Sequence, residues 1–259
     1  MENYQKLFSL EGKRALIPGG TGGLGSAIAA AFLQSGADVA VCGGHPEKAC
    51  ELEEYARECG RRFLSIRCNI TNPGEVNAML DQIAETFGGL DILVNCAGIN
   101  RLIHAEDYDD ATFSQVMDLN INGIHTVTRE TGKRFMIPAG YGRIVNLSSV
   151  KSLIGTTENY IAYCASKGAV NMYTKQLACE WGKYHITCNA IAPTFVRTPI
   201  NSFQLDDPVF YKKLTDRIPL GRIGMERDIA AAALYLCSDA AAFVNGQILC
   251  VDGGLTAMQ

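Results

Sequence analysis

The chain has 259 residues, long for one domain and short for two, so a single large α/β domain or a barrel is expected. With 47% hydrophobic and 19% charged residues, the composition excludes a disordered or collagen-like protein. The net charge is −4, and no cluster of Lys and Arg offers a binding surface for nucleic acid or an anionic membrane. We therefore expect a small-molecule substrate as partner, and neither nucleic acid nor a membrane.

Ten cysteines are spread along the chain, and no two have the C-x-x-C spacing typical of metal or redox sites. The first residues lack the apolar core of a signal peptide, and the longest hydrophobic run, 229–237, is far below the roughly 20 residues of a membrane span. We therefore expect a cytoplasmic protein without a metal site, with cysteines that serve mostly as small buried hydrophobes.

Short apolar runs alternate with helical patterns along the whole chain. This alternation predicts an α/β fold with a doubly wound (Rossmann) parallel sheet of seven strands and helices on both faces. No linker or repeat interrupts the pattern, so residues 1–259 are expected to form a single Rossmann-fold domain, with 194–222 as a substrate lid within it. Strands are expected at 14–18, 38–43, 62–70, 91–98, 142–148, 185–192 and 247–252, and helices at 23–36, 46–59, 73–88, 111–136, from about 160, and around 227–236.

A glycine-rich loop follows the first expected strand and leads directly into an Ala-rich helix. Its glycines would permit a tight turn and close approach to a diphosphate, while the start of the helix supplies free N–H groups. The position between strand and helix favours nucleotide binding over a simple glycine turn. The candidate cofactor-binding residues of this loop are Gly19, Thr21, Gly22, Gly23, Leu24 and Gly25.

The end of the second expected strand bears on the choice between NAD and NADP. An acidic residue there would bind the ribose 2′-hydroxyl of NAD, but Gly43, Gly44 and His45 occupy this place. The missing carboxylate removes a repulsion against a 2′-phosphate, and the glycines leave room for it, although no Arg is present. NADP(H) is therefore slightly favoured over NAD(H), with His45 either a cofactor contact or a solvated loop residue.

Tyr163 and Lys167 are four residues apart on an expected helix and so share one face. A phenol with a pKa of about 10 exchanges protons poorly near neutral pH unless a cation stabilises its phenolate. Ser149, just after the preceding strand, could hydrogen-bond a substrate oxygen while Tyr163 exchanges its proton. The three residues suit hydride transfer at a carbonyl, although an isolated Tyr–Lys pair can also be an ordinary helix surface pair.

These motifs resemble those of the short-chain dehydrogenase/reductase family over essentially the whole chain. The glycine loop is similar to the family motif T-G-x-x-x-G-x-G. The segment Asn-Cys-Ala-Gly at 95–98 is similar to N-N-A-G, and Val-Asp-Gly-Gly at 251–254 is similar to the family's C-terminal signature. The resemblance implies a catalytic tetrad of Asn120, Ser149, Tyr163 and Lys167. Tyr163 would be the acid/base, Lys167 would lower its pKa, and Ser149 would orient the substrate oxygen. Asn120 would hold a water in a proton relay.

The resemblance also implies cofactor contacts and a homotetramer. The family usually assembles through helices equivalent to 111–136 and 160–184 and through the last strand. The additional implied cofactor-binding residues are Asn69, Ile70, Asn95, Ala97, Gly98, Tyr163, Lys167, Pro193, Val196 and Thr198.

Four positions depart from the family pattern and bear on cofactor affinity more than on chemistry. Pro18, Cys96, Asn69 and Thr194 stand where the family usually has Thr, Asn, Asp and Gly. Asn69 is expected to accept a hydrogen bond from adenine through its carbonyl. Because Cys96 lies at a cofactor position, we expect the enzyme to be sensitive to oxidation or alkylation.

The candidate substrate residues are polar and include two cations, Arg101 and Lys151, which could hold a carboxylate or phosphate or could simply be solvated. Several stretches resemble sugar-acid enzymes of the gluconate 5-dehydrogenase and 2-dehydro-3-deoxy-gluconate 5-dehydrogenase type. The expected function is an NAD(P)-dependent oxidoreductase interconverting a secondary alcohol and a ketone on a sugar acid or polyol. The substrate set is Arg101, Lys151, Tyr160 and Thr194.

Two other functions stay open. A 3-oxoacyl or hydroxysteroid-type ketone reductase would carry an apolar surface on the lid. A non-catalytic NAD(P)-binding sensor would fit the altered cofactor motifs, although the intact proton-transferring groups argue against it.

Overall fold

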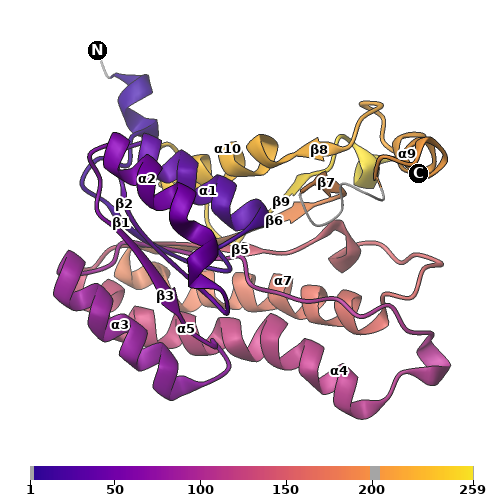
Figure 1. Ribbon diagram of the computed structural model, residues 1–259, viewed down its shortest axis with the longest axis horizontal. Helices are drawn as coiled ribbons and strands as arrows, with labels where there is room; N and C mark the ends of the chain where they lie inside the picture. The colour runs from indigo at the N-terminus through magenta and orange to yellow at the C-terminus, as the bar shows by residue number, and fades with distance from the viewer. Residues whose placement is uncertain (1–2, 199–204, 259) are drawn as a thin grey trace.

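A sheet of seven parallel strands runs through the centre of the protein (Figure 1). The structure is a computed structural model that describes residues 3–198 and 205–258. The strand order β3-β2-β1-β4-β5-β6-β9 reverses direction between β1 and β4, which confirms the doubly wound sheet expected from the sequence. The strands are β1 (Arg14–Pro18), β2 (Asp38–Gly43), β3 (Phe63–Arg67), β4 (Ile92–Asn95), β5 (Gly142–Leu147), β6 (Ile186–Pro193) and β9 (Ile248–Val251).

Helices cover both faces of the sheet and enclose two apolar cores (Figure 1). One core lies under α1, α2 and α10, and the other under α3, α5 and α7, so both faces of the central strands are buried. The helices are α1 (Gly23–Gln34), α2 (Cys50–Glu58), α3 (Pro73–Phe87), α4 (Asp110–Met117), α5 (Ile124–Thr131), α6 (Ile137–Ala139), α7 (Ile161–Trp181), α9 (Pro208–Thr215) and α10 (Glu226–Cys237).

Local chemistry sets the ends of α3. The Asn72 side chain accepts hydrogen bonds from the N–H groups of Gly74 and Glu75, and Pro73 occupies the first turn, where its missing N–H is not needed. Gly88 then ends the helix in the left-handed conformation at φ +75°. The capping residues therefore explain why the sequence predicts this helix almost to the residue.

The expected helix at 111–136 is interrupted by two π-helical turns, Asp118–Gly123 and Gly132–Met136. Both turns contain a glycine at a close contact. A Cβ at Gly123 would lie 2.8 Å from the Ile70 side chain, and one at Gly132 would lie 2.1 Å from the Trp181 ring. A single π turn often marks a functional site, and the first one carries the fully buried Asn120.

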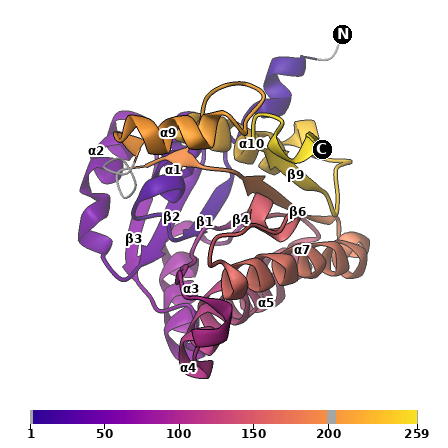
Figure 2. The same cartoon turned by 90° about the vertical axis from the view of Figure 1, so that its right-hand side faces the viewer.

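The expected lid at 194–222 contains a short strand and a helix, while 199–204 lie outside the described residues. β7 (Val196–Arg197) pairs with β8 (Gly224–Met225) in a small second sheet that the sequence did not predict. Leu214, Ile218 and Ile223 join Leu205 in an apolar cluster of their own. Figure 2 shows α9 on the side of the molecule that also carries α10, with α7 on the other side of the sheet.

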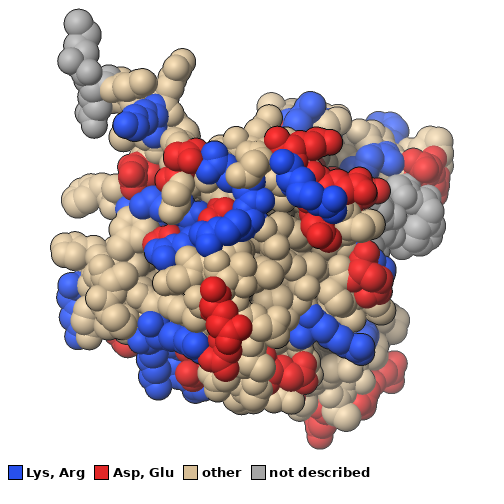
Figure 3. All heavy atoms as spheres, turned by 60° about the vertical axis from the view of Figure 1, so that its left-hand side comes forward, with Lys and Arg blue, Asp and Glu red and all other residues tan. Residues whose placement is uncertain are grey.

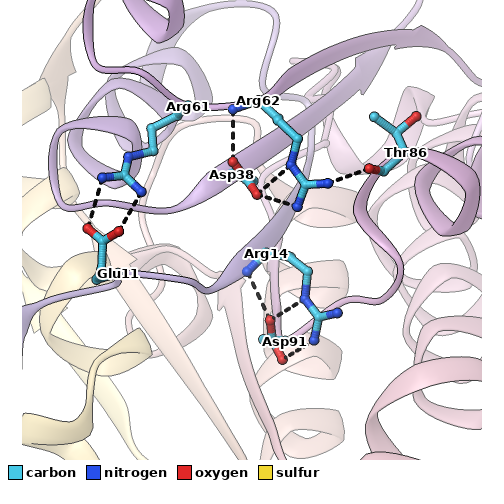
Figure 4. Close-up of polar contacts among 7 residues, drawn as sticks. All are labelled: Glu11, Arg14, Asp38, Arg61, Arg62, Thr86 and Asp91. Atoms are coloured by element: carbon cyan, nitrogen blue, oxygen red, sulfur yellow. Dashed lines mark hydrogen bonds and ion pairs between the residues drawn. The ribbon is translucent and has the colours of Figure 1, made fainter.

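Ion pairs tie together the amino ends of the first four strands (Figure 4). The Arg14 guanidinium donates to both carboxylate oxygens of Asp91 at 2.7 and 2.8 Å, and its backbone N–H donates to the same group at 2.9 Å. Arg62 donates in the same forked way to Asp38. These contacts lie at the edge opposite the strand ends where ligands bind, so we assign them to stability.

Charged side chains of both signs are intermixed over the face shown in Figure 3. Within residues 3–198 and 205–258, no helix is long and apolar enough to cross a membrane. In the same part of the chain, no group of three or more His, Cys, Asp or Glu residues could hold a metal ion.

The expectation that the cysteines are mostly buried is wrong for several of them. Cys50 and Cys179 are exposed, because each lies on the outer face of a surface helix. The pattern of apolar residues could not assign these helix faces to core or solvent without the sheet. Only four cysteines are fully buried, namely Cys42, Cys68, Cys188 and Cys237.

Candidate active site

A cavity of about 510 Å³ opens at the carboxyl ends of β4, β5 and β6. In a doubly wound sheet ligands bind at this edge. The loops after β1 and β4, where the strand order reverses, lead to opposite faces of the sheet and leave a crevice between them. The loops after these strands, the first turns of α7 and the segment after α9 all contribute to it. The lining residues are Leu24, Cys96, Gly98, Ile99, Asn100, Leu147, Ser148, Ser149, Val150, Lys151, Ile154, Tyr160, Tyr163, Lys167, Pro193, Thr194, Phe195, Val196, Thr198, Leu214, Arg217, Ile218 and Leu255.

Ser149, Tyr163 and Lys167 meet on this cavity, as the sequence pattern predicts. Ser149 follows β5 and shares a hydrogen bond with Tyr163, while the backbone N–H of Lys151 donates to the Ser149 hydroxyl at 3.2 Å. The buried Lys167 ammonium donates to the Leu147 carbonyl at 2.6 Å and lies 5.6 Å from the centre of the Tyr163 ring. A hydroxyl, a phenol and an ammonium therefore face one another where a substrate oxygen would sit.

Burial moves the pKa values of the two titratable groups in opposite directions. It raises the pKa of Tyr163 above its ordinary value, and the hydrogen bond with Ser149 offsets only part of this rise. Burial lowers the pKa of Lys167 to about 8. Near neutral pH the phenol is therefore protonated and ready to donate, while Lys167 still carries its charge for most of the time.

Asn120 lies just behind the cavity and holds the loop after β4. Its Oδ1 accepts from the Ile99 N–H at 2.8 Å, and its Nδ2 donates to the Ile99 carbonyl at 2.9 Å and to Ser166 Oγ at 3.0 Å. A Cβ added at Gly98 would lie 3.2 Å from Asn120 Oδ1 and 3.5 Å from Lys167 Nζ. Asn120 and Lys167 thus both lie close to the α-carbon of Gly98, although Asn120 itself does not line the cavity.

The glycine loop fits a dinucleotide diphosphate. Gly19 has φ +81°, and a Cβ there would lie 2.7 Å from the Ala97 N atom. A Cβ at Gly25 would lie only 2.3 Å from the Gly19 carbonyl oxygen, so both positions exclude any side chain. Gly22 caps α1 without a side-chain hydrogen bond, and open space lies at its α-carbon. The start of α1 therefore offers uncapped N–H groups beside a free cradle, as a diphosphate requires.

The three predicted cofactor residues at the end of β2, Gly43, Gly44 and His45, differ in the space and the contacts around them. A Cβ at Gly43 would lie 2.9 Å from Thr21 Oγ1, so this glycine lets the phosphate loop lie against the strand. Gly44 has open space around it, and the exposed His45 ring lies 3.0 Å from the Glu47 carboxylate.

Arg67 is a basic residue at this edge that the sequence analysis missed. It ends β3 and is the direct register partner of Gly43. The side chain is exposed and has no ion pair or hydrogen bond with any of the residues that the structure describes. Only the strand register, which a single sequence does not reveal, identifies its position beside the end of β2.

The expectation that Asn69 accepts a bond from adenine does not fit its contacts. Its Oδ1 already accepts from the Thr71 N–H at 3.1 Å and from the Thr71 hydroxyl at 2.9 Å. The Asn69 Nδ2 has no partner among the described residues, so the side chain offers a donor rather than an acceptor.

Asn95 and Ile70 lie in the core rather than on the cavity. Asn95 is 1% exposed and donates to Thr128 Oγ1 and Asn146 Oδ1 at 3.1 and 2.8 Å. Ile70 packs against the π turn at Gly123. Their side chains therefore support the loop and strand ends, and their role in cofactor binding stays a prediction.

Three of the four expected substrate residues line the cavity: Lys151, Tyr160 and Thr194. Arg101 does not, because the chain has turned to the surface by this point and its exposed guanidinium donates to the Asn100 carbonyl at 3.1 Å. Arg217, at the far end of the expected lid region, lines the cavity as well and adds a third cation to Lys151 and Lys167.

The cavity is also more apolar than expected. Phe195, Leu214, Ile218 and Leu255 belong to one apolar cluster and form an apolar wall of the cavity. Ile99 and Ile154 add two more aliphatic side chains to a cavity that was expected to be polar.

Cys96 lines the cavity, but its buried surroundings disfavour the reactive thiolate form. Burial raises the pKa of Cys96 to about 12, so almost no thiolate forms near neutral pH. The expected sensitivity to alkylation is therefore not supported by this geometry, even though the residue lies at the expected place.

Comparison with known proteins defines the class of this chain. A family model described as enoyl-(acyl carrier protein) reductase matches residues 19–256. The chain belongs to the short-chain dehydrogenase/reductase family and is an oxidoreductase.

Several of its relatives are named as dehydrogenases of polyols or sugar acids. It is 38% identical to D-threitol dehydrogenase from Mycolicibacterium smegmatis over 251 residues, which is 96% of this chain and 95% of the relative. It is also 38% identical to 2-dehydro-3-deoxy-D-gluconate 5-dehydrogenase from Bacillus subtilis over 249 residues, covering 95% and 96%. A crystal structure of gluconate 5-dehydrogenase from Burkholderia cenocepacia in complex with NADP and tartrate matches with a TM-score of 0.92 at 34% identity, covering 99% and 100%.

Proposed function

We propose that this protein is an NAD(P)-dependent dehydrogenase that interconverts a secondary alcohol and a ketone on a polyol or sugar acid. The observation that carries the proposal is the meeting of Ser149, Tyr163 and Lys167 on one cavity next to the glycine loop. The substrates named for the similar relatives, threitol and deoxygluconate among them, support the substrate class.

The nicotinamide ring supplies or accepts the hydride when the cofactor is bound. The Ser149 hydroxyl orients the substrate oxygen, and Tyr163 gives this oxygen its phenolic proton during reduction or takes the proton during oxidation. The Lys167 ammonium stabilises the phenolate and would contact the nicotinamide ribose of a bound cofactor. Asn120 fixes the loop at Ile99 and, in the proposed relay, holds a water between Lys167 and solvent.

For the cofactor, we propose NADP(H) over NAD(H). The end of β2 carries no acid, and Arg67, which has no charged partner among the described residues, brings a cation beside Gly43 that suits a 2′-phosphate. The NADP in the similar gluconate 5-dehydrogenase structure supports the same choice.

Fluorescence titration of the two reduced cofactors measures this preference without turnover. Arg67→Gln should weaken NADPH binding roughly 10-fold or more and leave NADH binding unchanged within about 2-fold. Equal loss for both cofactors, or none, would contradict the role of Arg67.

Tyr163→Phe tests the reaction itself. The variant should lose at least about 1,000-fold in turnover, since it lacks the phenol that shares a hydrogen bond with Ser149, and should bind the cofactor like the parent protein. Unchanged turnover would overturn the mechanism. If the parent protein bound cofactor but gave no absorbance change with any polyol, sugar acid or ketone, the non-catalytic sensor would be favoured instead.

The apolar wall of the cavity supports a second candidate, a 3-oxoacyl or hydroxysteroid-type ketone reductase. Phe195, Leu214 and Ile218 would contact an acyl chain or a ring system there. A panel of polyols, sugar acids, acyl thioesters and steroid ketones separates the two functions, and the higher kcat/KM identifies the substrate class.

A homotetramer is the proposed assembly. β9 is an edge strand with Leu249 36% exposed, and Met172 on α7 is 62% exposed, so apolar side chains lie on the elements that the family resemblance assigns to subunit contacts. Size-exclusion chromatography with light scattering gives the mass directly, and a monomer at micromolar concentration would contradict the proposal.

A further inference from the structure

Lys151, Glu158 and Arg217 form a charged cluster beside the cavity. The Glu158 carboxylate lies 3.4 Å from Lys151 Nζ through one oxygen and 3.9 Å from Arg217 Nη1 through the other. The Thr156 hydroxyl also donates to Glu158. Lys151 and Arg217 line the cavity, whereas Glu158 bridges them from behind. The Glu158 carboxylate thus pairs with two cations, and the two positive charges and one negative charge give the cluster a net charge of about +1 near neutral pH.

The Lys151 ammonium is held close to the reacting groups. Its side chain is only 10% exposed, and Nζ lies 4.6 Å from the centre of the Tyr160 ring. The residue follows Ser149 by two positions, and its backbone N–H donates to the Ser149 hydroxyl. An ammonium with so little water around it is stabilised by any further anion that enters the cavity.

Resting on the proposed function, we propose that Lys151 and Arg217 bind the carboxylate of a sugar acid, and that this cluster makes the enzyme prefer sugar acids over neutral polyols of the same length. The single excess positive charge matches one carboxylate. Glu158 holds the two cations in place when no substrate is bound and competes with the substrate carboxylate for them. A neutral polyol gains nothing from the excess charge.

The test compares kcat and KM for gluconate and for glucitol, the polyol of the same carbon chain. Lys151→Met should raise the KM for gluconate roughly 10- to 100-fold and change the KM for glucitol less than about 3-fold. Arg217→Gln should act in the same direction with a smaller effect, because its side chain is 47% exposed. Glu158→Gln should act in the opposite direction and lower the KM for gluconate, since it removes the competing anion.

Lys213→Met is the matched control. Lys213 lies on α9 a few residues before Arg217, is exposed, and does not line the cavity. The variant makes the same charge change as Lys151→Met and should leave both KM values unchanged. Comparing Lys213→Met with Lys151→Met separates carboxylate binding in the cavity from a general effect of the protein's net charge.

The outcomes distinguish this inference from the proposed function. Opposite shifts for Lys151→Met and Glu158→Gln, seen with gluconate alone, support carboxylate binding. If both variants impair gluconate and glucitol equally, the cluster only supports the fold and the inference is overturned. If the parent protein oxidises glucitol but not gluconate, the inference fails and the proposed function stands. If it oxidises neither and no other polyol or sugar acid, the proposed function fails as well.

Discussion

Lys167 Nζ donates a 2.6 Å hydrogen bond to the carbonyl oxygen of Leu147, the last residue of β5. The bond joins α7 to the end of the strand that precedes Ser149, so one contact fixes the relative position of two elements that carry the reacting groups. It also keeps a charged amine in a buried place where its pKa falls to about 8.

Lys167→Met should reduce turnover at least about 100-fold, since no cation remains to stabilise the Tyr163 phenolate. It should also change how stability depends on pH. The folded-state pKa of about 8 lies below the ordinary value near 10.4, so between these values the unfolded chain binds more protons and stability rises with pH. Urea unfolding at pH 7.5 and pH 10 should show a smaller rise for the variant than for the parent protein. An equal rise in both would mean that Lys167 is not responsible.

Alcohol oxidation and ketone reduction should depend on pH in opposite ways. Burial keeps the pKa of Tyr163 above its usual range, so the protonated phenol that reduction requires persists through neutral pH. Oxidation requires the deprotonated phenol and should accelerate as the pH rises towards 10, while reduction should slow. Profiles of kcat/KM from pH 6 to pH 10.5 in both directions measure this. Parallel profiles would contradict Tyr163 as the acid/base.

Asp91→Ala should destabilise the fold by about 2 kcal/mol without changing KM. The carboxylate is largely buried and accepts three hydrogen bonds from Arg14 at the amino end of the sheet, far from the cavity. Urea denaturation measures the loss. Asp81→Ala is the control, because the Asp81 side chain that pairs with Arg134 is 61% exposed and its loss should be close to zero. Equal effects for both variants would show that burial does not set the value of these pairs.

Gly25→Ala should abolish dinucleotide binding, because its Cβ would lie 2.3 Å from the Gly19 carbonyl oxygen and push the phosphate loop away from α1. Gly168→Ala makes the same chemical change inside α7, where no atom lies within 4 Å of the added carbon. This control should bind cofactor normally and gain up to about 1 kcal/mol in stability. Cofactor fluorescence and thermal unfolding of both variants provide the comparison, and normal binding by Gly25→Ala would refute the close fit.

Thiol labelling at pH 7.5 should modify Cys50 first and leave turnover intact. Cys50 is exposed on α2, away from the elements proposed for subunit contacts, whereas burial raises the pKa of Cys96 to about 12 and suppresses its thiolate. Mass spectrometry of peptides after timed iodoacetamide treatment gives the order of reaction. Rapid labelling of Cys96 with parallel loss of activity would restore the sequence-based expectation and contradict the structure.

The local patterns of this sequence determine the strand and helix order, the glycine loop and the pairing of Tyr163 with Lys167. Each of these follows from residues close together in the chain: alternating apolar runs, glycines between a strand and a helix, and a spacing of one helical turn. The structure confirms the seven-stranded sheet in full, with a switch point where the sequence motifs converge.

Only the tertiary structure decided which side chains face the cavity and what they contact. It brought Arg217 to Lys151 across 66 positions of sequence, put Arg67 beside Gly43, turned Arg101 to the surface and occupied the carbonyl of Asn69 with Thr71. Such contacts depend on strand register and on the paths of loops, and these are set by packing between distant segments. For that reason the sequence determined which reactive side chains the site contains, and the fold determined the charge and shape of the cavity around them.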